Sequence, residues 1–175
     1  MNLQLRTPFS MIISGPSNSG KTTKLRTILE ESHSLFERKP AKFILFYKEW
    51  QSAYDRFSSD GLVDEFIEGM PTQEYAETVI KKYSSSCIIF DDLAQNLSPV
   101  VQYLFCVGSH HHNCSIILLA QNLFSKNPVW RTVSLNATYF LLQRNPRDPS
   151  QVSNLSKQIF PGLKNFLGRV CKYTI

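Results

Sequence analysis

Phe9-Ser10-Met11-Ile12-Ile13-Ser14-Gly15-Pro16-Ser17-Asn18-Ser19-Gly20-Lys21-Thr22 is the stretch that decides the fold. Its first half is apolar, as in a buried strand, and its second half matches G-x-x-x-x-G-K-[ST] with a helical pattern after it. The glycines let the backbone curl so that its N–H groups face phosphates, and the helix start adds the positive end of a dipole. This order of strand, loop and helix predicts a P-loop that binds ATP and Mg²⁺.

The contacts expected in this loop follow from residue type. Lys21 would reach the β- and γ-phosphates and take part in catalysis as well as binding, and the Thr22 hydroxyl would ligate Mg²⁺. The rest of the expected nucleotide site consists of Gly15, Pro16, Ser17, Asn18, Ser19, Gly20 and Thr23.

Two acidic residues close a second apolar run. Cys87–Phe90 has the pattern of a strand and is followed directly by Asp91 and Asp92. Open α/β sheets bind their ligands at the carboxyl ends of the strands. We therefore expect Asp91 to hold Mg²⁺ and Asp92 to orient or deprotonate the attacking water. An acid after a strand can instead cap a helix, and this alternative stays open for Asp92.

A third polar residue, Gln121, follows the apolar run Ile116–Ala120. In P-loop proteins that have an extra strand between the P-loop strand and the metal strand, this position faces the γ-phosphate. A glutamine there can sense the phosphate or position water. The alternative is a loop amide that bonds to the backbone.

Apolar β-rich runs alternate with helical stretches along the whole chain. This indicates an α/β fold whose mainly parallel sheet is flanked by helices, with a P-loop NTPase core of the ASCE, RecA-like type. The five expected strands are Phe9–Ser14, Phe43–Tyr47, Cys87–Phe90, Ser115–Ala120 and Ala137–Leu142. Helices are expected from Gly20 to about His33, after the cap Thr72, after the cap Ser98 with Pro99 in the first helical position, and from the cap Asp148 to a point before Pro161. The 175 residues fit one P-loop ATPase domain, 1–175.

Composition narrows the setting. No apolar run approaches the roughly 18 residues of a membrane span, and the first residues lack a signal-peptide pattern. The four cysteines form no C-x-x-C pair, which is typical of an intracellular protein. A zinc site from Cys106, His110, His112 and Cys114 is a weaker interpretation, because Cys106 falls in the packing stripe of a helix.

Two further segments have polar and apolar residues side by side. Asp64, Glu65 and Glu68 flank Phe66 and Ile67, which indicates an amphipathic surface element rather than a carboxylate pair. Trp50 follows the second expected strand. It is either an exposed contact residue for nucleotide or a neighbouring subunit, or a partly buried anchor.

Positive charge is concentrated in the last third of the chain. The formal net charge is +5 overall, but residues 121–175 contain a single acid, Asp148. The basic residues of this stretch are Lys126, Arg131, Arg144, Arg147, Lys157, Lys164, Arg169 and Lys172. Such a bias favours a nucleic-acid face, the alternative being the solvated surface of a basic protein.

Several short motifs stand in one order along the chain. They are the P-loop, Ile89-Phe90-Asp91-Asp92, Ser109-His110-His111-His112-Asn113, Ile116–Ala120 with Gln121-Asn122-Leu123-Phe124, Ser134-Leu135-Asn136-Ala137 and Asn145-Pro146-Arg147-Asp148. This order resembles the genome-packaging ATPases of Polinton/Maverick and adintovirus-like elements, which are similar to the poxvirus packaging ATPase and belong to the FtsK–HerA superfamily. The resemblance runs from about Phe9 to Pro161.

The resemblance implies an ATP-driven motor that threads double-stranded viral DNA into a preformed capsid. It implies a homo-oligomeric ring, hexamer or pentamer, with ATP at the subunit boundaries, and a capsid portal or vertex protein as partner. The work would take place at the assembling virion, in the nucleus or cytoplasm of the host. It also implies that the Gln121 strand lies between the P-loop and metal strands, with Gln121 as the polar sensor.

One position departs from the family pattern. Relatives tend to carry Arg where His112 stands, so an arginine that acts on a neighbour's nucleotide has to be sought elsewhere. Arg131 is the first candidate and Arg147 the second, with Arg144 also available; surface ion pairs are the alternative role for them.

Two other functions fit a P-loop. A small P-loop kinase could use the segment 144–147 as an arginine lid, and a non-translocating remnant could bind nucleotide and a partner. Asp91-Asp92 followed by Gln121 favours hydrolysis over transfer to a metabolite, because water has to be activated. The intact Lys21 and Thr22 argue against a decayed site.

Overall fold

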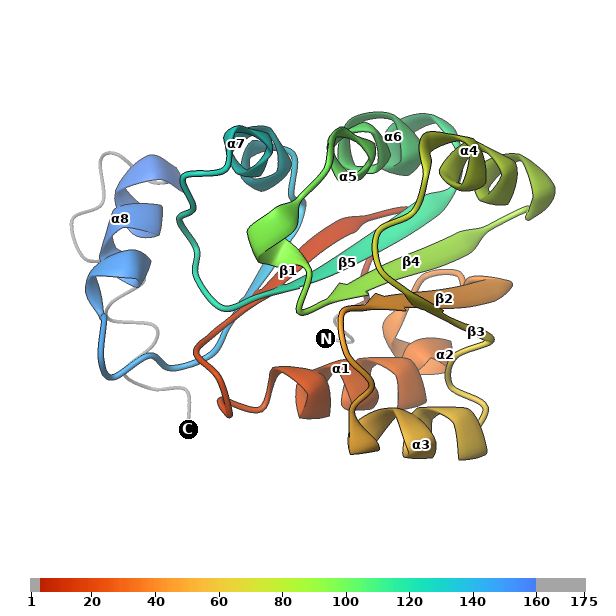
Figure 1. The fold of residues 1–175 in the computed structure, drawn as a ribbon, viewed down its shortest axis with the longest axis horizontal. Helices are drawn as coiled ribbons and strands as arrows, with labels where there is room; N and C mark the ends of the chain where they lie inside the picture. Colours follow the sequence, from red (N-terminus) through yellow and green to blue (C-terminus); the bar gives the residue numbers. More distant parts are fainter. Residues whose placement is uncertain (1–3, 160–175) are drawn as a thin grey trace.

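Parallel strands form the centre of the molecule. In the computed structural model, which describes residues 4–159 apart from the His110 side chain, six strands form one parallel sheet in the order β3-β2-β4-β5-β1-β6 (Figure 1). The strands are β1 (Ser10–Ser14), β2 (Lys42–Tyr47), β3 (Glu65–Glu68), β4 (Ser86–Asp91), β5 (Cys114–Ala120) and β6 (Tyr139–Leu142). The expected α/β class is confirmed, and β5 lies between the P-loop strand β1 and the acidic strand β4.

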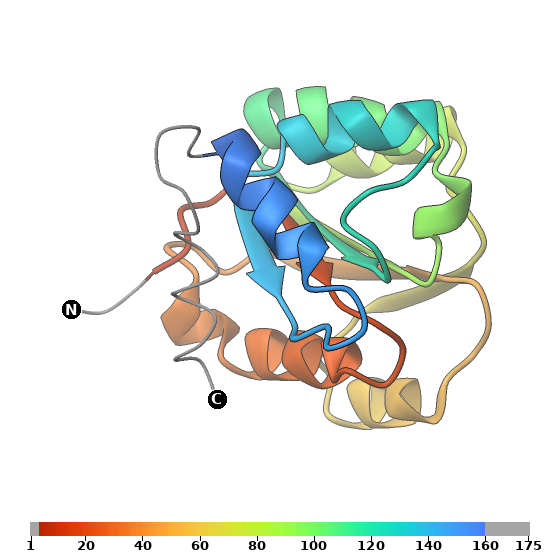
Figure 2. The same cartoon turned by 90° about the vertical axis from the view of Figure 1, so that its left-hand side faces the viewer.

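Helices cover both faces of this sheet. Below it in Figure 1 lie α1 (Lys21–Glu30), α2 (Ser32–Leu35) and α3 (Ser52–Ser59). Above it lie α4 (Gln73–Lys82), α5 (Pro99–Tyr103), α6 (Ser109–His111) and α7 (Pro128–Leu135). A 3₁₀ turn (Ala94–Asn96) precedes α5, and a π-helical segment (Leu104–Gly108) joins α5 to α6. The last described helix, α8 (Ser150–Ile159), lies beside the sheet edge formed by β6 (Figure 2).

The central strands are mainly apolar because both of their faces are covered. Every residue of β1, β4 and β5 is buried. Successive side chains point to opposite faces, so Ile12 and Ile88 join the core under α4, α5 and α7, whereas Ile13 and Ile89 join the core over α1 and α3. Full burial of each such side chain stabilises the fold by roughly 1.5–3 kcal/mol.

The helix starts agree in part with the sequence. Thr72 caps α4, because its hydroxyl accepts a hydrogen bond from the Tyr75 N–H at 3.1 Å. Asp148 accepts hydrogen bonds from the Ser150 N–H at 3.2 Å and from Gln151 at 2.8 Å, as expected of a cap. The prediction that Ser98 caps α5 is wrong for its side chain: the hydroxyl is buried and bonds to no described residue, although Pro99 begins the helix.

Some elements differ from the sequence prediction. The sheet has a sixth strand, β3, where we expected only an amphipathic surface element. It is a short edge strand whose Glu65 pairs with Lys42 at 3.1 Å. Helices α3 and α7 were not predicted, and the helix expected to reach about His33 is divided at Glu31 into α1 and α2. The last helix was expected to end before Pro161. Its last described residue is Ile159, and Pro161 itself lies outside the described part of the chain.

None of the helices described between residues 4 and 159 is long and apolar enough to cross a membrane.

Candidate nucleotide site

The carboxyl ends of β1, β4 and β5 meet at one edge of the sheet and border a cleft of about 430 Å³. Its lining consists of Ser17, Asn18, Gly20, Lys21, Thr22, Thr23, Gln51, Asp91, Asp92, Ala94, Gln95, Leu119 and Gln121. The three parts of the site predicted from separate stretches of sequence are therefore brought together. The parallel sheet does this, because all its strands end on the same side.

The P-loop itself is packed tightly on the neighbouring strands. The Gly15 N–H donates to the Ala120 carbonyl at 3.1 Å. A Cβ atom at position 15 would lie 2.5 Å from Cβ of Gln143, the residue after β6, and 2.6 Å from the Ser19 hydroxyl, so only glycine fits. Asn18 and Gly20 have φ values of 61° and 90°, left-handed conformations that turn the chain into α1.

The side chain of Lys21 folds back over this loop. Its Nζ donates to the carbonyl oxygens of Gly15 and Pro16, both at 2.9 Å. Partial burial lowers the pKa of Lys21, and the nearby carboxylates of Asp91 and Asp92 oppose that shift. The ammonium group therefore already lies inside the curve of the loop, where phosphates would enter.

Asp91 is almost fully buried, at 3% exposure, beside the start of α1. Its Oδ2 accepts hydrogen bonds from the Tyr54 hydroxyl at 2.9 Å and from the Thr22 hydroxyl at 3.4 Å. Burial raises the pKa of Asp91, and the hydrogen bond from Tyr54 partly offsets this. Burial, followed by the charge of Asp91, also raises the pKa of Tyr54 well above its ordinary value.

The Thr22 and Asp91 oxygens suit a magnesium ion. Mg²⁺ is held in phosphate-binding sites by one or two protein carboxylates together with hydroxyls, waters and phosphate oxygens. A hydroxyl and a buried carboxylate within 3.4 Å of each other are such a donor set. The side chains described between residues 4 and 159, which do not include that of His110, contain no cluster of three His, Cys, Asp or Glu groups that could hold a metal by themselves. The weaker zinc interpretation therefore gains no support from Cys106, His112 and Cys114.

Asp92 and Gln121 form a pair across the ends of β4 and β5. The Gln121 amide Nε2 donates to Asp92 Oδ1 at 3.1 Å. Asp92 is exposed and has φ 57°, a conformation that costs a residue with a side chain energy and is concentrated at functional sites. The 3₁₀ turn after it has no side-chain cap, so the structure gives no support to the capping alternative.

The candidate arginines lie outside the cleft. Arg131 is exposed on α7, and Arg144 and Arg147 are exposed in the loop between β6 and α8. None of them borders the cleft of its own chain. Trp50 donates its indole N–H to Asp55 at 3.0 Å and packs on neighbouring rings, as in the anchor interpretation. It is also 49% exposed, so the alternative of a contact residue stays open.

Sequence reasoning missed four polar residues near the site: Tyr54, Gln51, Gln95 and Gln143. Gln51 could have been found, because it follows β2, the strand that pairs with β4, and strand ends at this edge meet. Tyr54 had no local signal, because its contact with Asp91 joins residues 37 positions apart.

Comparisons with known proteins agree with this fold. No protein-family model matches the sequence, and no curated protein matches it. The cytoplasmic domain of the Thermomonospora curvata Type VII secretion ATPase EccC is similar in structure, with a TM-score of 0.54 and 11% identity over 81% of this chain and 20% of that one. ATPases 2 and 3 of EssC from Geobacillus thermodenitrificans give a TM-score of 0.50 and 15% identity over 83% of this chain and 37% of theirs.

A further structure, the cytoplasmic domain of EssC, gives a TM-score of 0.52 and 13% identity over 85% of this chain and 35% of that one. The present chain thus spans between a fifth and two fifths of the solved chains to which it is similar. At these identities the similarity concerns the fold alone. Fold and P-loop together show that the chain has a P-loop NTPase fold, similar to the ATPase domains of EccC and EssC.

Proposed function

We propose that the chain is an Mg²⁺-dependent ATPase, a subunit of a ring that drives double-stranded DNA into a capsid. One observation carries the enzymatic half of this proposal. The P-loop lysine, a buried carboxylate beside Thr22 and the Asp92–Gln121 pair border a single cleft.

Each residue has a role in hydrolysis that its contacts support. Lys21 would orient and neutralise the terminal phosphates, and Thr22 and Asp91 would hold Mg²⁺, which supplies further neutralisation of the phosphate oxygens. The Gln121 amide donates a hydrogen bond to Asp92 Oδ1, so that Oδ2 is left to accept a proton from the attacking water. Because Asp92 is exposed, water can reach this oxygen.

This arrangement favours hydrolysis over the kinase alternative. The only cation among the described residues that border the cleft is Lys21, so no arginine of residues 4–159 forms a lid over the phosphates from within the chain. The experiment is phosphate release from ATP with no acceptor present. A kinase would release little phosphate until its acceptor is added, and a non-catalytic nucleotide-binding protein would release none.

Lys21 is the only described cation at the cleft, and this also supports a ring in which a neighbouring subunit supplies a second one. A supplied arginine is worth roughly 10³–10⁵ in rate in related chemistry. Arg131 and Arg147 are exposed, and neither forms an ion pair with another described residue, so either can act on the nucleotide of a neighbour. Mixed rings of Lys21→Ala and Arg131→Ala subunits should recover hydrolysis that neither pure population shows; the same test applies to Arg147→Ala. Parental rates in both pure arginine variants would exclude these residues.

Support for DNA as the substrate comes from the family resemblance and from charge. The described basic residues of the last third are all exposed: Lys126, Arg131, Arg144, Arg147 and Lys157. The other three, Lys164, Arg169 and Lys172, lie outside the described residues. Cations that contact DNA phosphates release counterions, so affinity for duplex DNA should fall steeply as salt rises. Affinity that does not change with salt, or ATP hydrolysis indifferent to duplex DNA, would count against a packaging motor.

A further inference from the structure

Helix α3 carries Tyr54, whose buried hydroxyl contacts Asp91, the carboxylate of the proposed magnesium site. Tyr54 is fully buried and its hydroxyl donates to Asp91 Oδ2 at 2.9 Å. The same oxygen accepts the Thr22 hydroxyl at 3.4 Å. Two hydroxyls from different helices thus converge on one carboxylate oxygen, and together they restrict how the carboxylate can rotate.

Packing holds the Tyr54 ring in place independently of its hydroxyl. The rings of Tyr47, Trp50, Phe57 and Phe66 surround it, with centroids 5.6, 5.5, 5.9 and 6.2 Å away. Aromatic pairs at such separations are each worth about 0.5–1.5 kcal/mol beyond the area they bury. The position of the phenol oxygen is therefore set before any ligand arrives.

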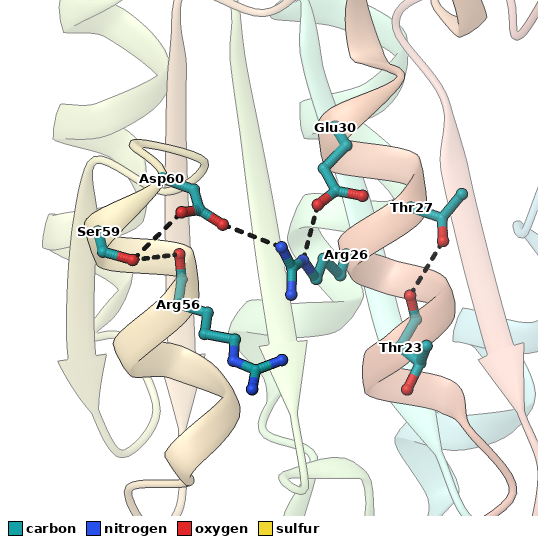
Figure 3. A network of polar contacts seen from close by, with 7 residues as sticks. All are labelled: Thr23, Arg26, Thr27, Glu30, Arg56, Ser59 and Asp60. Atoms are coloured by element: carbon teal, nitrogen blue, oxygen red, sulfur yellow. Dashed lines mark hydrogen bonds and ion pairs between the residues drawn. The ribbon is translucent and has the colours of Figure 1, made fainter.

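The far end of α3 is fixed to the helix that carries Thr22. Arg26 of α1 donates to Asp60, the C-cap residue directly after α3, at 3.0 Å and to Glu30 at 2.7 Å (Figure 3). The Ser59 hydroxyl donates a hydrogen bond to the other carboxylate oxygen of Asp60, Oδ1, at 3.2 Å. The helices that place Tyr54 and Thr22 are thus joined to each other as well as to Asp91.

We propose that Tyr54 is a positioning residue that acts through Asp91 to shape the Mg²⁺ site. The inference rests on the proposed function, since it concerns the metal that would accompany the nucleotide. Partners of this kind orient a metal-binding carboxylate, and their loss typically weakens metal affinity about 10–100-fold. Nucleotide binding without the metal depends on the P-loop and does not involve Tyr54.

The test compares Tyr54→Phe with a matched control, Tyr75→Phe. The Tyr75 hydroxyl also donates to a carboxylate, Glu65 Oε2 at 3.0 Å, and its ring packs on Phe46 at 5.8 Å, but neither residue borders the cleft. Binding of a fluorescent ATP analogue is measured in EDTA and across a Mg²⁺ titration. We expect equal affinity in EDTA for the parent and both variants. The Mg²⁺ concentration for half-maximal binding should rise roughly 10-fold in Tyr54→Phe alone.

Thermal melting in EDTA establishes that the variants fold, and a double variant shows the route of the effect. In an Asp91→Asn background, Tyr54→Phe should add no further change to the Mg²⁺ titration, because the group through which it acts is gone. An unchanged Mg²⁺ midpoint in Tyr54→Phe, or a shift that persists in the Asp91→Asn background, overturns the inference and leaves the proposed function intact. A parent protein whose nucleotide binding is indifferent to Mg²⁺ would instead overturn the proposed function.

Discussion

Gly15→Ala is a sharp test of how the P-loop is packed. The added Cβ would lie 2.5 Å from Cβ of Gln143 and 2.6 Å from the Ser19 hydroxyl. Carbon atoms pack best at about 3.5–4.0 Å, so the contact with Gln143 is too close by roughly 1 Å. The Ser19 hydroxyl can rotate away, but Gln143 Cβ cannot, because the Gln143 N–H bonds to the Ser14 carbonyl at 2.7 Å.

Either the loop or the end of β6 must therefore shift. Overpacking of this kind costs about 1–3 kcal/mol. For a chain of this size each kcal/mol lowers Tm by roughly 2–4 °C, which predicts a fall of roughly 2–12 °C. Because the loop backbone carries the phosphate-binding N–H groups, ATP affinity should fall as well.

The assay is thermal melting and ATP binding of the parent, Gly15→Ala and a control, Gly108→Ala. A Cβ on Gly108 would meet its nearest neighbour, a Leu104 methyl, at 3.4 Å, an ordinary contact. Alanine in this helical segment should leave Tm unchanged or raise it. Gln143→Gly should partly rescue Gly15→Ala by removing the clashing atom. Parental melting and ATP affinity in Gly15→Ala would refute the packing argument.

Three further predictions concern the charged groups. Asp92→Asn should bind Mg·ATP like the parent but hydrolyse it roughly 10²-fold more slowly, and parental turnover would exclude it as the base. Burial raises the pKa of Asp91 above its value in the unfolded chain. At a pH between these two pKa values, the folded chain therefore holds a proton that the unfolded chain has lost. The free energy of unfolding without ligand should thus rise as pH falls from neutral toward the ordinary carboxyl value of about 4. Asp91→Asn should raise Tm in EDTA at neutral pH and remove that dependence, and a lower Tm would contradict the burial argument. Arg26→Ala should cost no more than about 1 kcal/mol in denaturant unfolding, since its partners Glu30 and Asp60 are partly exposed.

The sequence predicts the elements whose signals are local. β1, β4 and β5 each contain a continuous apolar run, and the P-loop has fixed spacing, so the positions of these strands could be predicted. The convergence of Lys21, Asp91 and Gln121 then followed from the rule that parallel strands end together. α7 begins at Asn127-Pro128, where Asn127 accepts from the Val129 N–H at 2.9 Å. This is the cap-and-proline pattern that we used at Ser98-Pro99, so α7 could have been predicted.

Other features depend on tertiary contacts. The strand β3 has only four residues with acids at both ends, and pairing with β2 rather than its own pattern makes it a strand. α3 has no side-chain cap and is held by its aromatic contacts, so nothing local indicates that Tyr54 reaches Asp91. Ser98 shows the converse, a correct cap position whose hydroxyl finds no partner among described residues.

Phosphate release from ATP by the parent, Lys21→Ala and Lys24→Ala tests the central claim most directly. Lys21 borders the cleft, whereas Lys24 is exposed in the same helix and does not. We predict release by the parent in Mg²⁺ but not in EDTA. Loss of at least roughly 10²-fold is expected in Lys21→Ala, with parental rates in Lys24→Ala. Thermal melting should show all three folded. Equal phosphate release by folded Lys21→Ala and parent protein would contradict the assignment of this cleft as an ATPase site.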